Sequence, residues 1–336
     1  MRDKDTWFIR IWDSKDPDIA GIGECGPLPG LSPDRLEMME DLLEDTIQKI
    51  QGMDLPSDVQ NIIELAGTLV SSDFPSVRFG LETAILDFIH GGKRKIFENG
   101  FFYGKLPVPI NGLIWMNEKS EMIRQASEKI ADGFNCIKMK IGAIKFDEEL
   151  EVLKFIRGVE NNNMTLRVDA NGAFSMAEVF NKLDLLARYR IHSIEQPIKP
   201  GSWESMAEIC RLSPIPIALD EELIGMSKRK EEMLDNIQPQ FIVLKPTLLG
   251  GFKETGEWID LAEKLGIGWW ITSMLESNIG LNAITQFAAG KAPKLIHGLG
   301  TGKLYSNNVG SPLSIQNGEI SYLLEKKWDY SIFPDL

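Results

Sequence analysis

Three acidic residues and one lysine recur along this chain at nearly equal intervals, each after a short apolar run. They are Asp169 in LRVDAN, Glu195 in SIEQPI, Asp220 in IALDEE and Lys245 in FIVLKPT. The separations are 26, 25 and 25 residues (195−169, 220−195 and 245−220), the length of one strand-plus-helix unit. Polar residues at the ends of successive buried strands meet at one rim of a parallel barrel, where such folds keep their chemistry. Three carboxylates with a lysine beside them indicate a hard divalent cation and an acid–base reaction.

Strand alternation adds two more lysines to this set. Side chains on a strand point alternately to its two faces. In CIKMKI the apolar Ile137 and Met139 can pack on the helical layer, so Lys138 and Lys140 must point into the barrel. The same alternation turns Lys245 inward. Buried ammonium groups are costly unless they are paired. Salt bridges between ordinary strand ends are therefore a poor explanation for so many charges at matching depth, and we expect a site.

The residue types at this rim favour magnesium. Mg²⁺ prefers oxygen ligands in octahedral geometry, so three carboxylates predict a Mg²⁺ site, with Mn²⁺ as a substitute. His90, His192 and His297 are isolated from one another, which argues against zinc. As a Lewis acid the cation would stabilise the enediolate formed when an α-proton leaves a substrate carboxylate. A neighbouring ammonium group and a cation lower the pKa of a lysine, which makes it a workable base.

The bulk composition excludes several classes of protein. The 336 residues are 43% hydrophobic and 25% charged, as in ordinary globular proteins. A net charge of −13 argues against a nucleic-acid partner. No apolar run reaches the roughly 18 residues that span a bilayer, and the N-terminus MRDKDTWFIR lacks an apolar signal core. The three cysteines form no CxxC pair, so we expect a cytoplasmic protein without disulfides and without a membrane partner. Nothing in the sequence specifies an oligomeric state.

The periodicity changes once along the chain. Residues 7–12 and 19–24 are expected to be strands and residues 34–90 to be interrupted helices, which makes an α+β unit. From residue 106 onward, apolar runs alternate with helical segments and predict eight strands over about 190 residues. We therefore expect an α/β protein, with a (β/α)8-type modified TIM barrel at 106–305 and a capping domain at 1–105 completed by 306–336. The acidic cluster DEELE at 147–151 predicts a solvated helix start.

The motifs KMK, DAN, EQP, LDE and LKP, in this order and spacing, resemble the enolase superfamily. The resemblance is to the muconate-lactonizing-like branch, which pairs a KxK strand with a lysine on the sixth strand. GIGECGPLPG and VRFGLETAILDF are similar to the family's capping domain, so the resemblance covers most of the chain. The branch begins with one more strand and a specificity loop before the strand that matches WFIRIW. We therefore expect that the N-terminal strand of the cap is missing from this sequence or that the cap is abbreviated.

The resemblance implies a role for each candidate residue. The implied metal ligands are Asp169, Glu195 and Asp220. Lys140 is the implied base, which removes the α-proton and then, in its protonated form, assists loss of hydroxide from the same face. Lys138 is implied to support the enediolate charge, and Lys245 to lie across the substrate. The implied contacts of a succinyl carboxylate are Ser273, Gly300 and Thr301.

The last two strands carry the resemblance that concerns the substrate. TSMLESNIGLNAI and GLGTGKLYSNN resemble branch members that dehydrate 2-succinyl-6-hydroxy-2,4-cyclohexadiene-1-carboxylate by syn-elimination of water, a lyase step of menaquinone biosynthesis. An N-acylamino acid racemase or a dipeptide epimerase of the same superfamily is the near alternative, because lysines on opposite faces suit two-sided proton transfer. The Asp-x-Asp that dipeptide epimerases carry on the last strand is replaced here by HGLGTG. A Schiff-base aldolase with Lys245 as nucleophile and a non-catalytic barrel remain as remoter alternatives.

Overall fold

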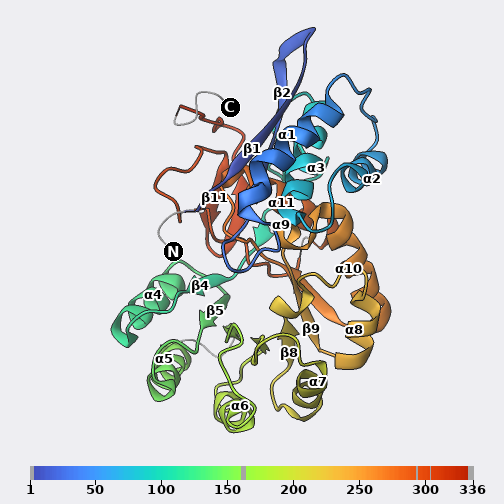
Figure 1. The fold of residues 1–336 in the computed structure, drawn as a ribbon. Coiled ribbons are helices and arrows are strands. Elements are labelled where there is room, and N and C mark those ends of the chain that lie inside the picture. Colours follow the sequence, from blue (N-terminus) through green and yellow to red (C-terminus); the bar gives the residue numbers. More distant parts are fainter. Residues whose placement is uncertain (1–3, 160–163, 293, 303, 332–336) are drawn as a thin grey trace.

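The computed structural model describes residues 4–159, 164–292, 294–302 and 304–331 of the chain. A curled parallel sheet ringed by helices forms the lower part of the view in Figure 1, and an α+β cap lies above it. The cap elements are β1 (Trp7–Asp13), β2 (Asp16–Cys25), the 3-10 turn η1 (Leu36–Met38), α1 (Met39–Ile50), α2 (Val59–Leu69) and α3 (Pro75–Ile89). No helix within the described ranges is both long and apolar enough to cross a bilayer.

The cap is built around the close approach of β2 to α3. β1 and β2 pair antiparallel, and β2 lies along α3. A Cβ added at Gly23 would stand 1.8 Å from the Gly80 carbonyl oxygen, so only glycine at position 23 permits this spacing. α3 is buried on nearly its whole circumference, as expected for a helix covered by a sheet on one side and other helices on the other.

Seven parallel strands form the main sheet, in the order β10-β9-β8-β7-β6-β5-β4. Their bounds are β4 (Gly112–Ile114), β5 (Cys136–Lys140), β6 (Thr165–Asp169), β7 (Ser193–Glu195), β8 (Ile217–Leu219), β9 (Phe241–Leu244) and β10 (Gly268–Ile271). The segments between and after them are α4 (Lys119–Ala131), α5 (Phe146–Val159), α6 (Val179–Ala187), α7 (Trp203–Leu212), η2 (Glu221–Leu223), α8 (Lys230–Ile237), α9 (Pro246–Leu249), α10 (Gly251–Leu265) and α11 (Asn278–Lys291). The strands neighbour one another in chain order, as in a (β/α) barrel.

The last expected barrel strand, which contains His297 and Gly298, closes the barrel by single bridges. Thr272 pairs in parallel with Gly298, and Ile110 pairs in parallel with His297. The Ser273 amide donates to the Gly298 carbonyl at 3.0 Å, and the Asn111 amide donates to the His297 carbonyl at 2.9 Å. Residues 297–298 therefore connect β10 to the start of the first barrel strand, and the predicted (β/α)8-type architecture is confirmed.

The predicted alternation of side chains is also confirmed. Ala218, Val243 and Trp270 form a separate apolar cluster inside the barrel, whereas Ile137 and Met139 belong to the main core between strands and helices. The inward positions near the strand ends are thus left for the charged residues, whose burial is explained by the strand period of two.

The C-terminal segment folds back as a hairpin. β11 (Leu313–Gln316) and β12 (Glu319–Tyr322) pair antiparallel, and β12 pairs with β3 (Val108–Pro109), which directly precedes the first barrel strand. Farther along, Trp328 and Tyr330 pack against a cluster that includes Ile22 of the cap. The tail therefore contacts both units, and the domain boundaries at 105/106 and 305/306 remain a prediction.

Candidate active site

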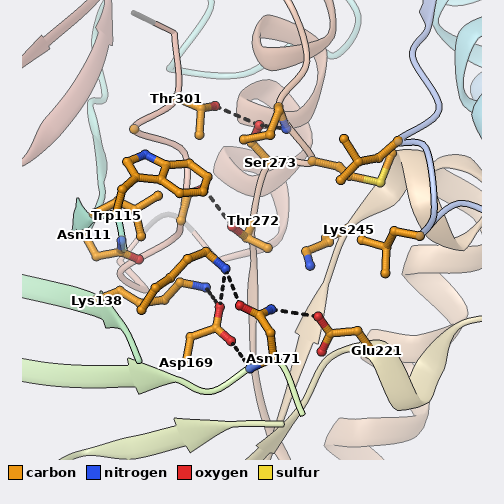
Figure 2. Close-up of a pocket in the computed structure, with 18 residues that line it drawn as sticks. Asn111, Trp115, Lys138, Asp169, Asn171, Glu221, Lys245, Thr272, Ser273 and Thr301 are labelled. Carbon is orange, nitrogen blue, oxygen red and sulfur yellow. Dashed lines mark hydrogen bonds and ion pairs between the residues drawn. The ribbon is translucent and has the colours of Figure 1, made fainter. Parts of the chain in front are cut away.

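Six charged residues predicted from the sequence meet at the carboxyl ends of the barrel strands. Two lie on β5 (Lys138 and Lys140), two end β6 and β7 (Asp169 and Glu195), and two follow β8 and β9 (Asp220 and Lys245). They surround or underlie a cavity of about 190 Å³ whose lining includes residues of the cap. Figure 2 shows Lys138 and Lys245 on opposite sides of this cavity.

The three carboxylates form a compact cluster. One oxygen from each of Asp169, Glu195 and Asp220 lies within 4.8 Å of the other two, and all three residues are at most 2% exposed. Three buried negative charges at this distance repel one another strongly in a low dielectric. The cluster therefore requires positive charge beside it.

The lysines supply part of that charge from both sides. Lys138 Nζ lies 2.6 Å from Glu195 Oε2 and 3.0 Å from Asp169 Oδ2. Lys140 Nζ lies 3.0 Å from the same Asp169 oxygen. Across the cavity, Lys245 Nζ lies 2.5 Å from an oxygen of Asp220. The ammonium groups thus flank the acidic cluster on two opposite walls.

The acids respond differently to this environment. Burial raises the pKa of Glu195 to about 7; Lys138 opposes the rise, and the negative charges of Asp169 and Asp220 add to it. Burial would raise the pKa of Asp169 as well, but the three lysines outweigh it and hold that pKa well below its usual range. Burial disfavours the charged form of Lys138, yet the surrounding carboxylates raise the pKa of its ammonium group. The site therefore holds Lys138 charged and leaves one carboxylate, Glu195, incompletely compensated.

This incomplete compensation fits a metal ion. Glu195 Oε1 is buried and has no hydrogen-bond partner within the described part of the chain, although buried polar atoms are normally paired. Three carboxylate oxygens within 4.8 Å match the ligand type and number with which proteins hold hard divalent cations. The residues present therefore fit a divalent cation bound by oxygen.

The predicted substrate contacts line the far wall of the same cavity, together with Gly298 and Thr272. Thr301 Oγ1 donates to Ser273 Oγ at 2.7 Å, and Ser273 Oγ donates to Glu276 Oε2 at 2.6 Å. Gly300, which has no side chain, lines this wall with its backbone. The structure thus places Ser273, Gly300 and Thr301 together, with both hydroxyl protons already donated.

Several lining residues were not predicted. Asn171 and Glu221 lie in the motifs DAN and LDE, one or two residues after a predicted metal ligand. Their position just beyond a strand end was the sequence feature that could have predicted them as lining residues. Trp115 follows the first barrel strand and lies with its ring 5.6 Å from Lys140 Nζ. Leu28 and Leu31 come from the cap loop, for which the sequence carried no comparable signal.

Comparison with known proteins agrees with this geometry. Residues 121–324 match the family model of enolase C-terminal domain-like proteins. The chain is 45% identical to an o-succinylbenzoate synthase of Desulfotalea psychrophila, over 95% of this chain and 92% of the relative.

The chain belongs to the enolase superfamily. This superfamily member also superposes on the crystal structure of MenC from Desulfotalea psychrophila with a TM-score of 0.87 and 41% identity, covering 95% of this chain and 94% of the other. An N-succinylamino acid racemase of Thermus thermophilus is 30% identical over 78% of this chain and 70% of its own length. The family that the motifs predicted is therefore confirmed, and similarity is greater to the synthase than to this racemase.

Proposed function

We propose that this enolase superfamily member is an o-succinylbenzoate synthase. It would be a lyase that removes water from 2-succinyl-6-hydroxy-2,4-cyclohexadiene-1-carboxylate during menaquinone biosynthesis. The observation that carries the proposal is the 45% identity, over 95% of the chain, to a relative of that name. The carboxylate cluster flanked by lysines supplies the groups that such a reaction needs. A biosynthetic role on a small carboxylate also supports the predicted cytoplasmic location.

The acidic cluster would hold Mg²⁺, or Mn²⁺ in its place, through Asp169, Glu195 and Asp220. When bound, the ion supplies Lewis-acid stabilisation for negative charge that develops on the substrate carboxylate. The unpartnered Glu195 Oε1 supports this assignment, because a cation would satisfy it. Hard oxygen ligands without histidine or cysteine favour Mg²⁺ over zinc.

Lys140 would carry out both proton transfers. It removes the proton from the carbon that bears the carboxylate, and the C–H electron pair is delocalised onto that carboxylate as an enediolate. The pair then returns to form the new ring double bond as the C–O bond breaks. The departing hydroxide takes the proton that Lys140 now holds, so water leaves from the same face. Lys138 lies between Glu195 and Asp169 and would support the developing negative charge. Lys245 would hold position electrostatically on the other face.

The walls of the cavity suit a ring with a flexible acidic arm. Leu28, Leu31 and Leu113 present apolar surface, whereas Ser273, Thr301 and the Gly300 backbone form a polar end. The succinyl carboxylate would bind at this polar end. Because the two hydroxyl protons are already donated within the protein, binding would require these hydroxyl groups to rotate toward the substrate.

A racemase acting on N-acylamino acids is the second candidate. The observation that favours it is the presence of lysines on both sides of the cavity, since Lys140 and Lys245 could exchange protons with opposite faces of one carbon. The 30% identity to an N-succinylamino acid racemase supports the same possibility. Both reactions begin by removing a proton next to a carboxylate.

The test is a direct assay of the purified full-length chain. The dehydration substrate is supplied with Mg²⁺, and the aromatic product is followed by its ultraviolet absorption. We expect turnover that stops with EDTA and returns with added Mg²⁺. An inactive chain that instead racemises N-succinylamino acids would replace the first candidate with the second. A borohydride-trapped adduct formed in EDTA would indicate a Schiff-base mechanism and contradict both.

A further inference from the structure

The side chain of Asn171 connects two walls of the cavity. The residue stands two positions after Asp169, just beyond the end of β6. Its Oδ1 accepts a hydrogen bond from Lys140 Nζ at 2.7 Å, and its Nδ2 donates to Glu221 Oε1 at 2.8 Å. Figure 2 shows the amide with a dashed line on each side, between the lysine wall and Glu221. A single amide therefore links the lysine on β5 to a carboxylate that follows β8.

The two partners permit one orientation of this amide. A lysine ammonium group only donates hydrogen bonds, and an ionised carboxylate only accepts them. The amide oxygen must therefore face Lys140, and the amide nitrogen must face Glu221. The flipped orientation would place like groups opposite each other on both sides. An amide, with a separate donor and acceptor, can satisfy both partners at once in this geometry.

The backbone around Asn171 is held as firmly as its side chain. The residue has a φ of +43°, in the left-handed region that asparagine tolerates better than most residues. Its own amide donates to Asp169 Oδ1 at 3.1 Å, and the next amide, of Gly172, donates to the Gln196 carbonyl at 2.7 Å. The turn thereby aims the side chain at Lys140 and Glu221 on the cavity wall, where the residue remains exposed to solvent.

Lys140 needs such a partner because its stem is flexible. A lysine side chain has four rotatable bonds and loses about 2 kcal/mol of rotamer entropy when it is held in one geometry. The other hydrogen bond of Lys140 is to Asp169 Oδ2, an oxygen that Lys138 also contacts at 3.0 Å. The ring of Trp115 limits its movement on one further side. Without Asn171, the ammonium group would rest on an oxygen shared with a second lysine.

Glu221 in turn holds the amide. Its Oε1 receives the Asn171 amide, and its Oε2 is buried without a hydrogen-bond partner within the described ranges. The residue lines the cavity beside Lys245. Removing its carboxylate would leave the amide nitrogen of Asn171 free to turn, and the oxygen would then no longer be directed at Lys140.

We propose that Asn171 is a positioning residue that, held by Glu221, fixes the Nζ atom of Lys140 in the cavity for proton transfer. The inference rests on the proposed function, in which Lys140 is the base. A general base must lie within about 2.6–3.2 Å of the atom that carries the proton it removes, and a displacement of about 1 Å can cost roughly 100-fold in rate. Loss of the amide should therefore lower kcat while substrate and metal binding change little.

The decisive variant is Asn171→Gly, because glycine adopts the left-handed backbone without strain and only the amide is lost. Its matched control is Asn317→Gly in the exposed turn between β11 and β12, where asparagine has a φ of +52°. With saturating Mg²⁺, we expect kcat to fall about 10- to 100-fold in Asn171→Gly, with KM and the Mg²⁺ concentration for half-activation changed less than about threefold. Asn317→Gly should retain wild-type kinetics.

Three outcomes would overturn the inference. The first is a kcat within about twofold of wild type in Asn171→Gly. The second is a loss that extra Mg²⁺ restores, which would mean that Asn171 supports the metal site rather than Lys140. The third is an equal loss in the Asn317→Gly control, which would mean a general effect of glycine at left-handed positions.

A substrate-independent measurement separates this inference from the proposed function. Crystal structures of wild type and Asn171→Gly, both with Mg²⁺, should show the Lys140 ammonium group displaced or disordered in the variant. An unmoved Lys140 overturns the positioning role whether or not the chain dehydrates the proposed substrate. A wild-type chain that lacks turnover, in contrast, overturns the proposed function alone.

A double variant tests the contribution of Glu221. Because both residues act through the same contact to Lys140, the kcat losses of Asn171→Gly and Glu221→Ala should not multiply. We expect the double variant to lie within about threefold of the slower single variant. Losses that multiply fully would show that Glu221 acts independently of Asn171, and would remove it from the proposal.

Discussion

The barrel interior has an upper layer at the carboxyl ends of the strands and a lower layer two residues earlier along them. The same alternation turns side chains inward in both layers, but their environments differ. At the end of β6, Asp169 lies in the acidic cluster beneath the cavity. Two residues earlier on the same face, the guanidinium carbon of Arg167 lies 3.9 Å from the ring centre of Trp270, and the group donates to the Ile296 carbonyl at 3.0 Å. The cavity lining includes Asp169 and does not include Arg167. A step of two residues along a strand separates a reactive layer from a packed one.

The lower layer disfavours the charged form of a histidine. Burial, with a smaller contribution from the charge of Arg167, lowers the pKa of His192 to about 4. The ring of His192 packs beside Phe241 and Trp270. In the upper layer, the charges of the lysines and carboxylates compensate one another. In the lower layer, a positive charge is stabilised by an aromatic face and a carbonyl. The alternation of side chains thus decides which residues point into the barrel. Their position along the strand decides whether they line the cavity or pack in the layer beneath it.

The largest expected effect lies in the upper layer. Lys140→Ala should lower kcat by about 10³-fold, because a general base contributes roughly 10²–10⁴-fold, while the melting temperature stays near that of wild type. Steady-state kinetics and thermal melts check both points. The exposed Lys145→Ala is the matched control and should keep wild-type rates. Full turnover in Lys140→Ala would remove Lys140 as the base.

The next effect concerns the metal. Asp220→Asn replaces a charged oxygen ligand with a neutral one, so half-activation should require about 10- to 100-fold more Mg²⁺. Titration of activity with Mg²⁺ measures this shift, and saturating metal should restore much of the rate. An activation curve that coincides with that of wild type would show that Asp220 is not a ligand.

The pH dependence of stability should distinguish Glu195, in the upper layer, from buried acids elsewhere in the protein. A carboxyl group whose pKa is raised by folding binds its proton more tightly in the folded state, so stability falls as pH rises through the window between the two values. For Glu195 in metal-free protein that window runs from its ordinary value of 4.5 to about 7. With EDTA, the free energy of unfolding should fall across this window by about 1–3 kcal/mol.

Glu82 provides the internal control for this measurement. Burial raises its pKa to about 8, but its carboxylate contacts the α10 backbone far from the acidic cluster. Mg²⁺ should therefore abolish the part of the pH dependence that belongs to Glu195 and leave the part from Glu82. Unfolding curves that have the same pH dependence with EDTA and with Mg²⁺ would contradict metal binding at Glu195.

The smallest effect on activity is expected in the lower layer. Arg167→Met keeps an unbranched apolar stem and removes the guanidinium charge and its stacking on Trp270. We expect a loss of about 1–2 kcal/mol in the free energy of unfolding, with kcat of the folded enzyme within about threefold of wild type. Chemical denaturation and kinetics measure the two quantities. A large loss of kcat without loss of stability would show that Arg167 takes part in the reaction and that the two layers do not differ in function.

One prediction from the sequence was wrong. The acidic cluster at 147–151 does open a helix, since α5 begins at Phe146, but Glu149 is not solvated. It is 1% exposed, and its carboxylate accepts hydrogen bonds from the amides of Gly142 at 2.6 Å and Ala143 at 3.2 Å. The loop after β5 folds back over the helix start, a path that charge patterning does not reveal.

The sequence by itself determined the spacing of Asp169, Glu195 and Asp220 and the inward direction of Lys138 and Lys140. Both follow from local rules, namely the length of a strand-plus-helix unit and the period of a strand. Only the tertiary structure decided that Leu28 from the cap reaches the cavity and that Asn171 bridges to Glu221. Those contacts join residues roughly 50 or more positions apart in the chain and depend on loop paths, which follow from packing rather than from any periodic pattern.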